Sequence, residues 1–226
     1  MNSKIYIVST PIGNLGDITL RAIDVLKQVD LVLCEDTRIA KKLLNHYKIT
    51  TPTLSYHQYS DTKKIRQIEK MLQNGKVLAL ITDAGTPGIS DPGNFLISNL
   101  VLRLSHSLDI IPIPGASSVT AALSISGFDC DKFIFLGFPP HKKRRKTFFA
   151  ELAKNRHTTI FFESNHRIRK AMQEMRNNLN ADTKIVICRE LTKKFESVYR
   201  GKIKDFDKMD MSERGEYVIV VDSSHP

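Results

Sequence analysis

Two kinds of hydrophobic pattern alternate along the first half of the chain. Short runs rich in β-branched residues alternate with longer segments whose apolar residues recur every three or four positions, the spacing of a buried helix face. The strand-like runs are Lys4–Val8, Leu31–Cys34, Lys76–Thr82 and Asp109–Ile113. This alternation of strand and helix predicts an α/β fold with a mainly parallel sheet and helices on both of its faces.

The helices between these strands are bounded by residues that commonly begin or end a helix. They are expected at Asp17–Val29, Asp36–Tyr47, Thr62–Asn74, Pro92–Leu104 and Ser117–Ser126. Asp17 is suited to cap the first helix, and Gly75 to end the third in a left-handed conformation. Because Lys76–Thr82 is apolar almost without interruption, we expect its strand in the middle of the sheet.

The second half continues the α/β pattern but ends differently. The expected elements are strands at Phe133–Leu136, Thr158–Phe162 and Lys184–Arg189, and a helix at Asn165–Leu179. Phe195–Arg200 and Glu216–Val221 alternate with period two and have no helix between them, which predicts a closing pair of strands. We therefore expect two α/β domains, residues 1–113 with a mainly parallel sheet and 114–226 with a mixed one, hinged at Pro112–Gly115.

Composition places the chain among globular proteins. Of its 226 residues, 41% are hydrophobic and 26% are charged, and no apolar run approaches the roughly 20 residues that span a bilayer. The N-terminal apolar run is too short for a secretory signal, so we expect a cytoplasmic protein that does not enter a membrane. Cys34, Cys130 and Cys188 lie far apart in or beside apolar segments, which favours buried free thiols.

Net charge points to a polyanionic partner. The formal charge is +10 and the isoelectric point is near 9.5, a balance that favours nucleic acid through steering and counterion release. The densest positive run is the predicted phosphate-binding segment, which consists of Lys142, Lys143, Arg144, Arg145 and Lys146. A merely solvated turn is the alternative interpretation of this run.

Loops after the first-half strands occupy the usual ligand-binding position of an open parallel sheet. Ser9–Asp17 and Asp83–Gly93 combine glycines, which allow close backbone approach, with prolines, which keep a loop rigid. Asp83 and Asp91 are suited to accept hydrogen bonds from an amine or a ribose hydroxyl. Ser117 begins a small-residue helix whose N–H groups suit a carboxylate, although it is equally suited to be a plain cap. Neither dinucleotide nor P-loop glycine spacing occurs.

Charged side chains also follow several strands. Glu35, Asp36 and Arg38 form a cluster suited to proton transfer or to positioning a hydroxyl, unless Asp36 only caps the next helix. In the second half, carboxylate, guanidinium, hydroxyl and ammonium groups gather in Phe162–Arg167 and Arg189–Lys194. The two segments together are a stronger signal of a site than either is alone.

These segments, in this order, resemble the tetrapyrrole methylase fold family of S-adenosylmethionine enzymes. The most specific elements are Thr10–Asp17, Glu35–Arg38, Asp83–Gly93, Phe162–Arg167 and Arg189–Lys193. Within the family they look like the branch that methylates the 2′ hydroxyl of a cytidine ribose in the decoding centre of 16S ribosomal RNA. One departure is Ala116, where that branch usually carries proline.

The resemblance implies two α/β domains with S-adenosylmethionine in a cleft between them, a homodimer, and 16S ribosomal RNA or the small ribosomal subunit as partner; no metal is expected. The residues implied for the cofactor are Ile12, Gly13, Asp83, Ala84, Gly85, Thr86, Ile89, Ser117, Ser118, Phe162 and Leu191. The candidates for taking the proton of the ribose hydroxyl are Glu35, Asp36, Glu163 and Glu190. The residues expected to orient phosphate and ribose are Arg38, Arg189 and Lys193.

Two other functions stay open at this point. A tetrapyrrole C-methyltransferase would use the same fold, but such enzymes typically carry Gly-Pro-Gly-Asp where this chain has Ile12-Gly13-Asn14, and a porphyrin-sized acid does not call for so basic a surface. A non-catalytic RNA-binding assembly protein would be expected to lack the acidic residues at the strand ends, and all four are present.

Overall fold

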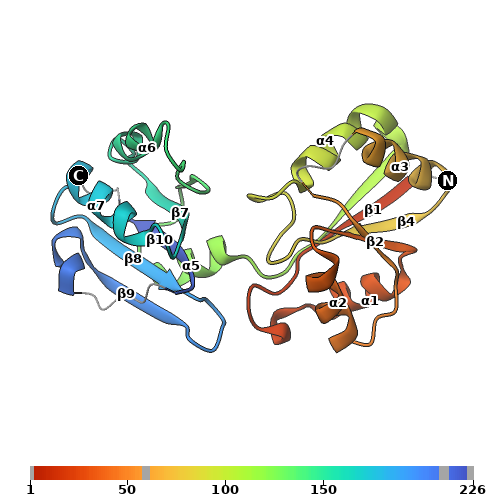
Figure 1. The fold of residues 1–226 in the computed structure, drawn as a ribbon, viewed down its shortest axis with the longest axis horizontal. Coiled ribbons are helices and arrows are strands. Elements are labelled where there is room, and N and C mark those ends of the chain that lie inside the picture. The colour runs from red at the N-terminus through yellow and green to blue at the C-terminus, as the bar shows by residue number, and fades with distance from the viewer. Residues whose placement is uncertain (1–2, 58–61, 209–213, 223–226) are drawn as a thin grey trace. The chain divides into compact units, whose positions relative to one another are not determined.

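The protein forms two compact units. The computed structural model describes residues 3–57, 62–208 and 214–222. The chain divides into Met1–Ser117 and Ser118–Pro226, and each unit contains its own five-stranded sheet (Figure 1). The α/β class predicted from the periodicity is confirmed.

The first unit is built on a parallel sheet. Its strands are β1 (Ser3–Val8), β2 (Leu31–Cys34), β3 (Thr53–Ser55), β4 (Val77–Leu80) and β5 (Leu108–Ile113). Their order is β3-β2-β4-β1-β5, and every pairing is parallel, so β4 lies in the middle as its apolar run predicts. The sequence did not predict β3, because three residues are too few to show a period.

Helices cover both faces of this sheet, as predicted (Figure 1). They are α1 (Leu20–Gln28), α2 (Thr37–His46), α3 (Thr62–Gln73) and α4 (Gly93–Leu104), with short 3-10 turns η1 (Leu15–Asp17) and η2 (Ser105–Ser107). Apolar side chains of α1 and α2 pack in one core cluster, and those of α3 and α4 in another. The predicted start of α1 was wrong, because Thr19 rather than Asp17 accepts the capping hydrogen bond, from Ala22 N at 3.1 Å.

The second unit has a mixed sheet. Its strands are β6 (Phe133–Phe135), β7 (Thr158–Ser164), β8 (Lys184–Arg189), β9 (Ser197–Lys202) and β10 (Glu216–Val221), in the order β6-β7-β10-β8-β9. The predicted closing pair of strands was wrong: β9 pairs with β8, and β10 inserts between β7 and β8. Five of the six residues of β10 are buried, so this strand is covered on both faces and lacks true alternation.

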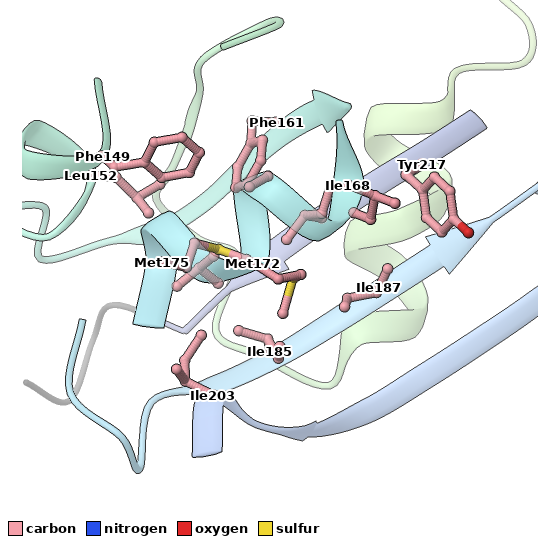
Figure 2. Close-up of a cluster of buried hydrophobic side chains, with 13 residues drawn as sticks. Phe149, Leu152, Phe161, Ile168, Met172, Met175, Ile185, Ile187, Ile203 and Tyr217 are labelled. Carbon is pink, nitrogen blue, oxygen red and sulfur yellow. The ribbon is translucent and has the colours of Figure 1, made fainter. Parts of the chain in front are cut away.

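The remaining helices pack on this second sheet. They are α5 (Ser118–Ser126), α6 (Arg145–Leu152) and α7 (Ile168–Asn178), with a 3-10 segment η3 (Ile203–Lys208). Figure 2 shows Phe149 of α6 and Met172 of α7 in one apolar cluster with Phe161 of β7. The sequence did not predict α6, since few of its eight residues are both apolar and buried. In the part of the chain that the structure describes, no helix is long and apolar enough to cross a membrane.

The three cysteines are free, as predicted, but Cys130 is only half-buried. Cys34 and Cys188 are buried, and burial raises the pKa of each thiol to about 11. Both therefore stay protonated at neutral pH and pack as small hydrophobic groups.

Candidate active site

The loops that follow β1 and β4 are bonded to one another at the carboxyl edge of the first sheet. Thr10 N donates to Gly85 O at 2.9 Å, and Gly85 N donates to Thr10 O at 3.1 Å. Gly85 has a φ of +84°, and a Cβ added to it would lie 3.5 Å from the side chain of Ile12. The structure therefore brings together Ile12 and Gly85, two residues that the resemblance assigns to the cofactor.

Thr86 links this pair of loops to the segment after β5. Its hydroxyl lies 2.9 Å from that of Ser9 and donates to Ala116 O at 3.4 Å. A Cβ added to Gly115 would lie only 3.0 Å from Ser9 Cβ, so the backbone passes very close to β1 at this point. Three strand ends thus meet in one hydrogen-bonded group. Ser9 belongs to the predicted loop Ser9–Asp17, but the sequence analysis gave it no role of its own.

The long loop after β4 is held by its own aspartate. The Asp91 carboxylate accepts from Gly88 N at 2.8 and 2.9 Å and from Gly93 N at 2.6 Å. The prediction that Asp91 accepts from a ligand amine or ribose is corrected, because backbone amides already occupy its oxygens. Ile89, at the tip of this loop, is 50% exposed and offers an apolar contact surface.

Glu35 and Asp83 form an acidic pair at the ends of β2 and β4. Asp83 Oδ1 accepts from Asp36 N at 3.2 Å, which ties the two strand ends together. Burial raises the pKa of Asp83, and burial, followed by the negative charges of Asp83 and Asp91, raises the pKa of Glu35. Glu35 is therefore a stronger base than an ordinary exposed carboxylate.

Asp36, next to Glu35 in the sequence, caps helix α2 and pairs with Arg38. Its Oδ1 accepts from Arg38 N at 2.8 Å, which caps α2, and its Oδ2 lies 2.6 Å from the Arg38 guanidinium. Hydrogen bonds from the Arg38 side chain and backbone lower the pKa of Asp36 to about 2. Asp36 is thus a weak base, whereas the Arg38 side chain, 87% exposed, faces solvent.

The charged segments of the second unit meet at one edge of its sheet. β7 and β8 end where the antiparallel β10 begins, and Ser164 pairs with Glu216 while Tyr217 pairs with both Glu163 and Arg189. The two groups that the sequence placed at strand ends are therefore neighbours, as their positions indicated.

Glu163 lies inside the second unit. Its side chain is fully buried, with Oε2 at 2.9 Å from Arg145 Nη2 and Oε1 at 2.9 Å from Arg167 Nη2. Oε1 also accepts from Ser164 N at 2.8 Å. These contacts occupy both oxygens, so the geometry does not support Glu163 as the proton acceptor. The prediction that Arg145 binds RNA phosphates is corrected, because its side chain is 3% exposed and is paired with Glu163. The other four residues of the phosphate-binding segment are exposed.

Glu190 and Lys193 form a second ion-pair group. Lys193 Nζ lies 2.9 Å from Glu190 Oε1 and 2.8 Å from Glu216 Oε2. Although burial raises the pKa of Glu190, hydrogen bonds from Lys193 and from Glu216 N outweigh it and lower that pKa. Arg189 donates to Arg214 O at 2.6 Å and to Phe195 O at 3.1 Å, so its guanidinium braces the surrounding backbone.

The residues implied for the cofactor are distributed over both units. Those of the first unit, apart from Ser117, lie on the β1 and β4 loops, and Ser117 follows the β5 loop; Ser118, Phe162 and Leu191 belong to the second unit. Phe162 is half-buried in an aromatic group, with ring centroids 5.0 Å from Phe135 and 5.2 Å from Phe138.

The chain combines two α/β units with polar loops at their strand ends, and this architecture corresponds to a known family of methyltransferases. Residues 4–207 match the family model described as Tetrapyrrole (Corrin/Porphyrin) Methylases. The chain belongs to the tetrapyrrole methylase family. A solved structure of a cobalt precorrin-4 methyltransferase superposes with a TM-score of 0.69 at 22% identity, covering 99% of this chain and 97% of that one. At such low identity the superposition supports the fold alone.

Within the family, the chain is similar over most of its length to proteins named Ribosomal RNA small subunit methyltransferase I. The one from Synechocystis sp. is 39% identical over 225 residues, which cover 98% of this chain and 80% of the relative. The one from Thermotoga maritima is 42% identical over 202 residues, 89% of each chain. These relatives confirm the resemblance at the level of their printed name, which is that of methyltransferases of small-subunit ribosomal RNA.

Proposed function

We propose that this protein transfers a methyl group from S-adenosylmethionine to RNA of the small ribosomal subunit, with the 2′ hydroxyl of a cytidine ribose in the 16S decoding centre as acceptor. The observation that carries the proposal is the 39–42% identity, over most of the chain, to relatives named for methylation of this RNA. The choice of the ribose hydroxyl rests on the motif resemblance.

The first-unit loops suit S-adenosylmethionine, which when bound supplies an electrophilic methyl group on a positively charged sulfur. Gly85 packs against Ile12 and Gly115 against Ser9, so the two glycines let the loops after three strands approach one another closely at this site. Ile89 adds apolar surface, and Asp83 adds a carboxylate for an amine or a ribose hydroxyl. We assign to this site Ile12, Gly13, Asp83, Ala84, Gly85, Thr86, Ile89 and Ser117, and retain Ser118, Phe162 and Leu191 from the resemblance.

Glu35 is the best of the four carboxylates for taking the proton of the hydroxyl. A general base works best when its pKa is close to the working pH, and the pKa of Glu35 is raised. The pKa values of Asp36 and Glu190 are lowered, and the oxygens of Glu163 are occupied. Arg38, exposed beside Glu35 in the sequence, is placed to orient a phosphate.

The charge distribution supports an RNA substrate, and most of the net positive charge that would attract RNA phosphates belongs to the second unit. Residues 118–226 hold 21 of the 34 Lys and Arg residues and 14 of the 24 Asp and Glu residues, which gives +7 of the total +10. The exposed members of the phosphate-binding segment, hereafter the basic group, are Lys142, Lys143, Arg144 and Lys146. Such cations gain affinity for phosphates through counterion release.

Radiolabelled methyl transfer tests the acceptor class. S-adenosylmethionine with a tritiated methyl group is offered with undermethylated small subunits, naked 16S RNA and uroporphyrinogen in parallel. Label in the subunit or the RNA, and none in the porphyrin, is the expected result. Label in the porphyrin alone would identify a tetrapyrrole methylase, whereas subunit binding without any label would identify an assembly protein.

A further inference from the structure

Phe138 exposes a phenyl ring beside the most basic segment of the chain. It lies after the carboxyl end of β6, and 52% of its surface is exposed. Its ring centroid is 5.2 Å from that of Phe162, whose other neighbour is Phe135 at 5.0 Å. Phe138 therefore packs at a tilt against a small aromatic cluster and leaves about half of its surface exposed to solvent.

The turn that carries Phe138 is held on both sides. Before the ring, Gly137 O accepts from Phe162 N at 2.8 Å. After it, Pro139 O accepts from Arg167 Nη1 at 3.1 Å, and Pro140 O accepts from Arg145 Nη1 at 3.3 Å. The two prolines have restricted backbones of their own. The backbone of the turn that carries the ring is thus held on both sides of Phe138.

The two guanidiniums that hold the turn are themselves held by one buried carboxylate. Arg145 and Arg167 each lie 2.9 Å from an oxygen of Glu163. Charged hydrogen bonds in a buried setting are strong and directional, so this group fixes the turn to the end of β7. The sequence separates Glu163 from Arg145 by 18 positions, and only the fold joins them.

Cations lie close to the ring along the chain. Lys142, Lys143 and Arg144 are exposed, and four residues of extended chain limit the Phe138–Lys142 Cα separation to about 14 Å. An exposed ring next to a row of cations is typical of sites for single-stranded nucleic acid, because bases stack on aromatic faces while cations follow the phosphates. Only unpaired bases are available for such stacking.

We infer that Phe138 is a stacking platform for an unpaired base of the RNA substrate, and that Lys142, Lys143 and Arg144 bind the phosphates next to that base. This inference rests on the proposed function, because it assumes an RNA substrate. The Phe138 ring would be the contact that selects an unpaired segment of that RNA. The buried Glu163–Arg145–Arg167 group acts as the support that positions the ring. Because every base has an aromatic face, the platform favours unpaired RNA without reading its sequence.

Binding of short RNAs to the full-length protein tests the inference. The probes are a single-stranded oligocytidine RNA and the same strand with abasic sites, measured by fluorescence anisotropy over a range of salt. Phe138→Ala is compared with Phe138→Trp, which keeps an aromatic face, and with Phe133→Ala, which removes an exposed phenyl at the other end of β6. Cofactor affinity is measured for each protein by calorimetry.

We expect wild type to bind the base-bearing strand about tenfold more tightly than the abasic strand. Phe138→Ala is expected to abolish that preference and leave the salt slope and cofactor affinity unchanged, while Phe138→Trp and Phe133→Ala keep it. An unchanged preference in Phe138→Ala would overturn the inference while leaving the proposed function standing if the protein still methylates small subunits. A loss of cofactor affinity alone would place Phe138 in the cofactor site, and absence of RNA binding by wild type would overturn the inference together with the proposed RNA substrate.

Discussion

Arg145 and Glu163 form an ion pair in the interior of the second unit, with Nη2 and Oε2 2.9 Å apart. The Arg145 guanidinium also lies over the ring of Phe149, at 5.2 Å from its centroid. The pair joins the start of α6 to the end of β7, two elements between which the sequence shows no obvious link. Arg145 therefore stabilises the fold through this ion pair, although it lies in a run of basic residues whose other members are exposed.

Removal of one partner of this pair is expected to destabilise the protein strongly. Arg145→Met leaves the buried Glu163 carboxylate with a single guanidinium, and losing one partner of a buried pair typically costs about 3–5 kcal/mol. The exposed neighbour provides the control, since Lys146→Met should change stability by less than about 0.5 kcal/mol. Urea denaturation measures both, and equal midpoints for the two variants would contradict the structural role of Arg145.

Glu35 is expected to limit the rate on the acid side. The deprotonated form acts as base, so the rate of methyl transfer should fall as pH falls through the raised pKa of Glu35. Glu35→Gln should lower the rate at least about a hundredfold and remove this acid limb. Steady-state kinetics from pH 5 to 9 checks the prediction, and an acid limb that persists in Glu35→Gln would assign it to another group.

The same residue should oppose stability. A carboxyl whose pKa is higher in the folded than in the unfolded state favours folding only while protonated, so its ionisation lowers stability as pH rises through the folded pKa. Glu35→Gln should therefore raise the free energy of unfolding at pH 7.

Asp36 is expected to have the opposite effect on stability. With its folded pKa at about 2, its contribution is present above the unfolded pKa near 4 and is lost as pH falls toward 2. Asp36→Ala should accordingly destabilise at pH 7, and the same sign of change in both variants would contradict this assignment.

The basic group is expected to set the salt dependence of RNA binding. Replacing Lys142, Lys143, Arg144 and Lys146 by alanine should reduce the slope of log affinity against log salt by up to about three, since each phosphate contact on a single strand contributes about 0.7. The control removes the same charge from the first unit, by alanine at Lys27, Lys41, Lys42 and Lys63, all of them exposed. Equal slopes for the two quadruple variants would show that net charge, and not this group, governs binding.

Gly85 is expected to matter for the cofactor as well as for folding. Gly85 and Gly75 have nearly the same positive φ, +84° and +80°, so alanine at either should cost roughly 1 kcal/mol in stability. Only Gly85 lies in the loop pair, where an added Cβ meets Ile12. Gly85→Ala should therefore weaken S-adenosylmethionine binding in calorimetry, while Gly75→Ala should not. Equal cofactor affinities in the two variants would remove Gly85 from the site.

Much of the first unit was predictable because its signals are local. The apolar run at 76–82 shows by itself that β4 is buried on both faces, and Gly75 ends α3 in the left-handed conformation that glycine permits. The place of β10 was not predictable in this way. Its pairing with β7 and β8 depends on segments far away in the chain, and the pattern of the strand alone does not determine its neighbours.

The same division holds for the candidate site. The neighbourhood of Glu35 and Asp83 follows from parallel strands, whose carboxyl ends meet at one edge. The burial of Glu163 and Arg145 and their ion pair do not follow from the sequence, because both arise only when α6 packs on the sheet. Asp91 is an intermediate case, since an aspartate close to two glycines in a loop is a known signal for side-chain capping of backbone amides.

The identity of the methylated nucleoside tests the central claim most directly. Undermethylated small subunits are incubated with the protein and S-adenosylmethionine, and their 16S RNA is digested to nucleosides and analysed by mass spectrometry against Glu35→Gln as control. The account predicts 2′-O-methylcytidine, formed by wild type and reduced at least about a hundredfold in the variant. A methyl group on a base, or no methylated nucleoside beyond the untreated level, would contradict it.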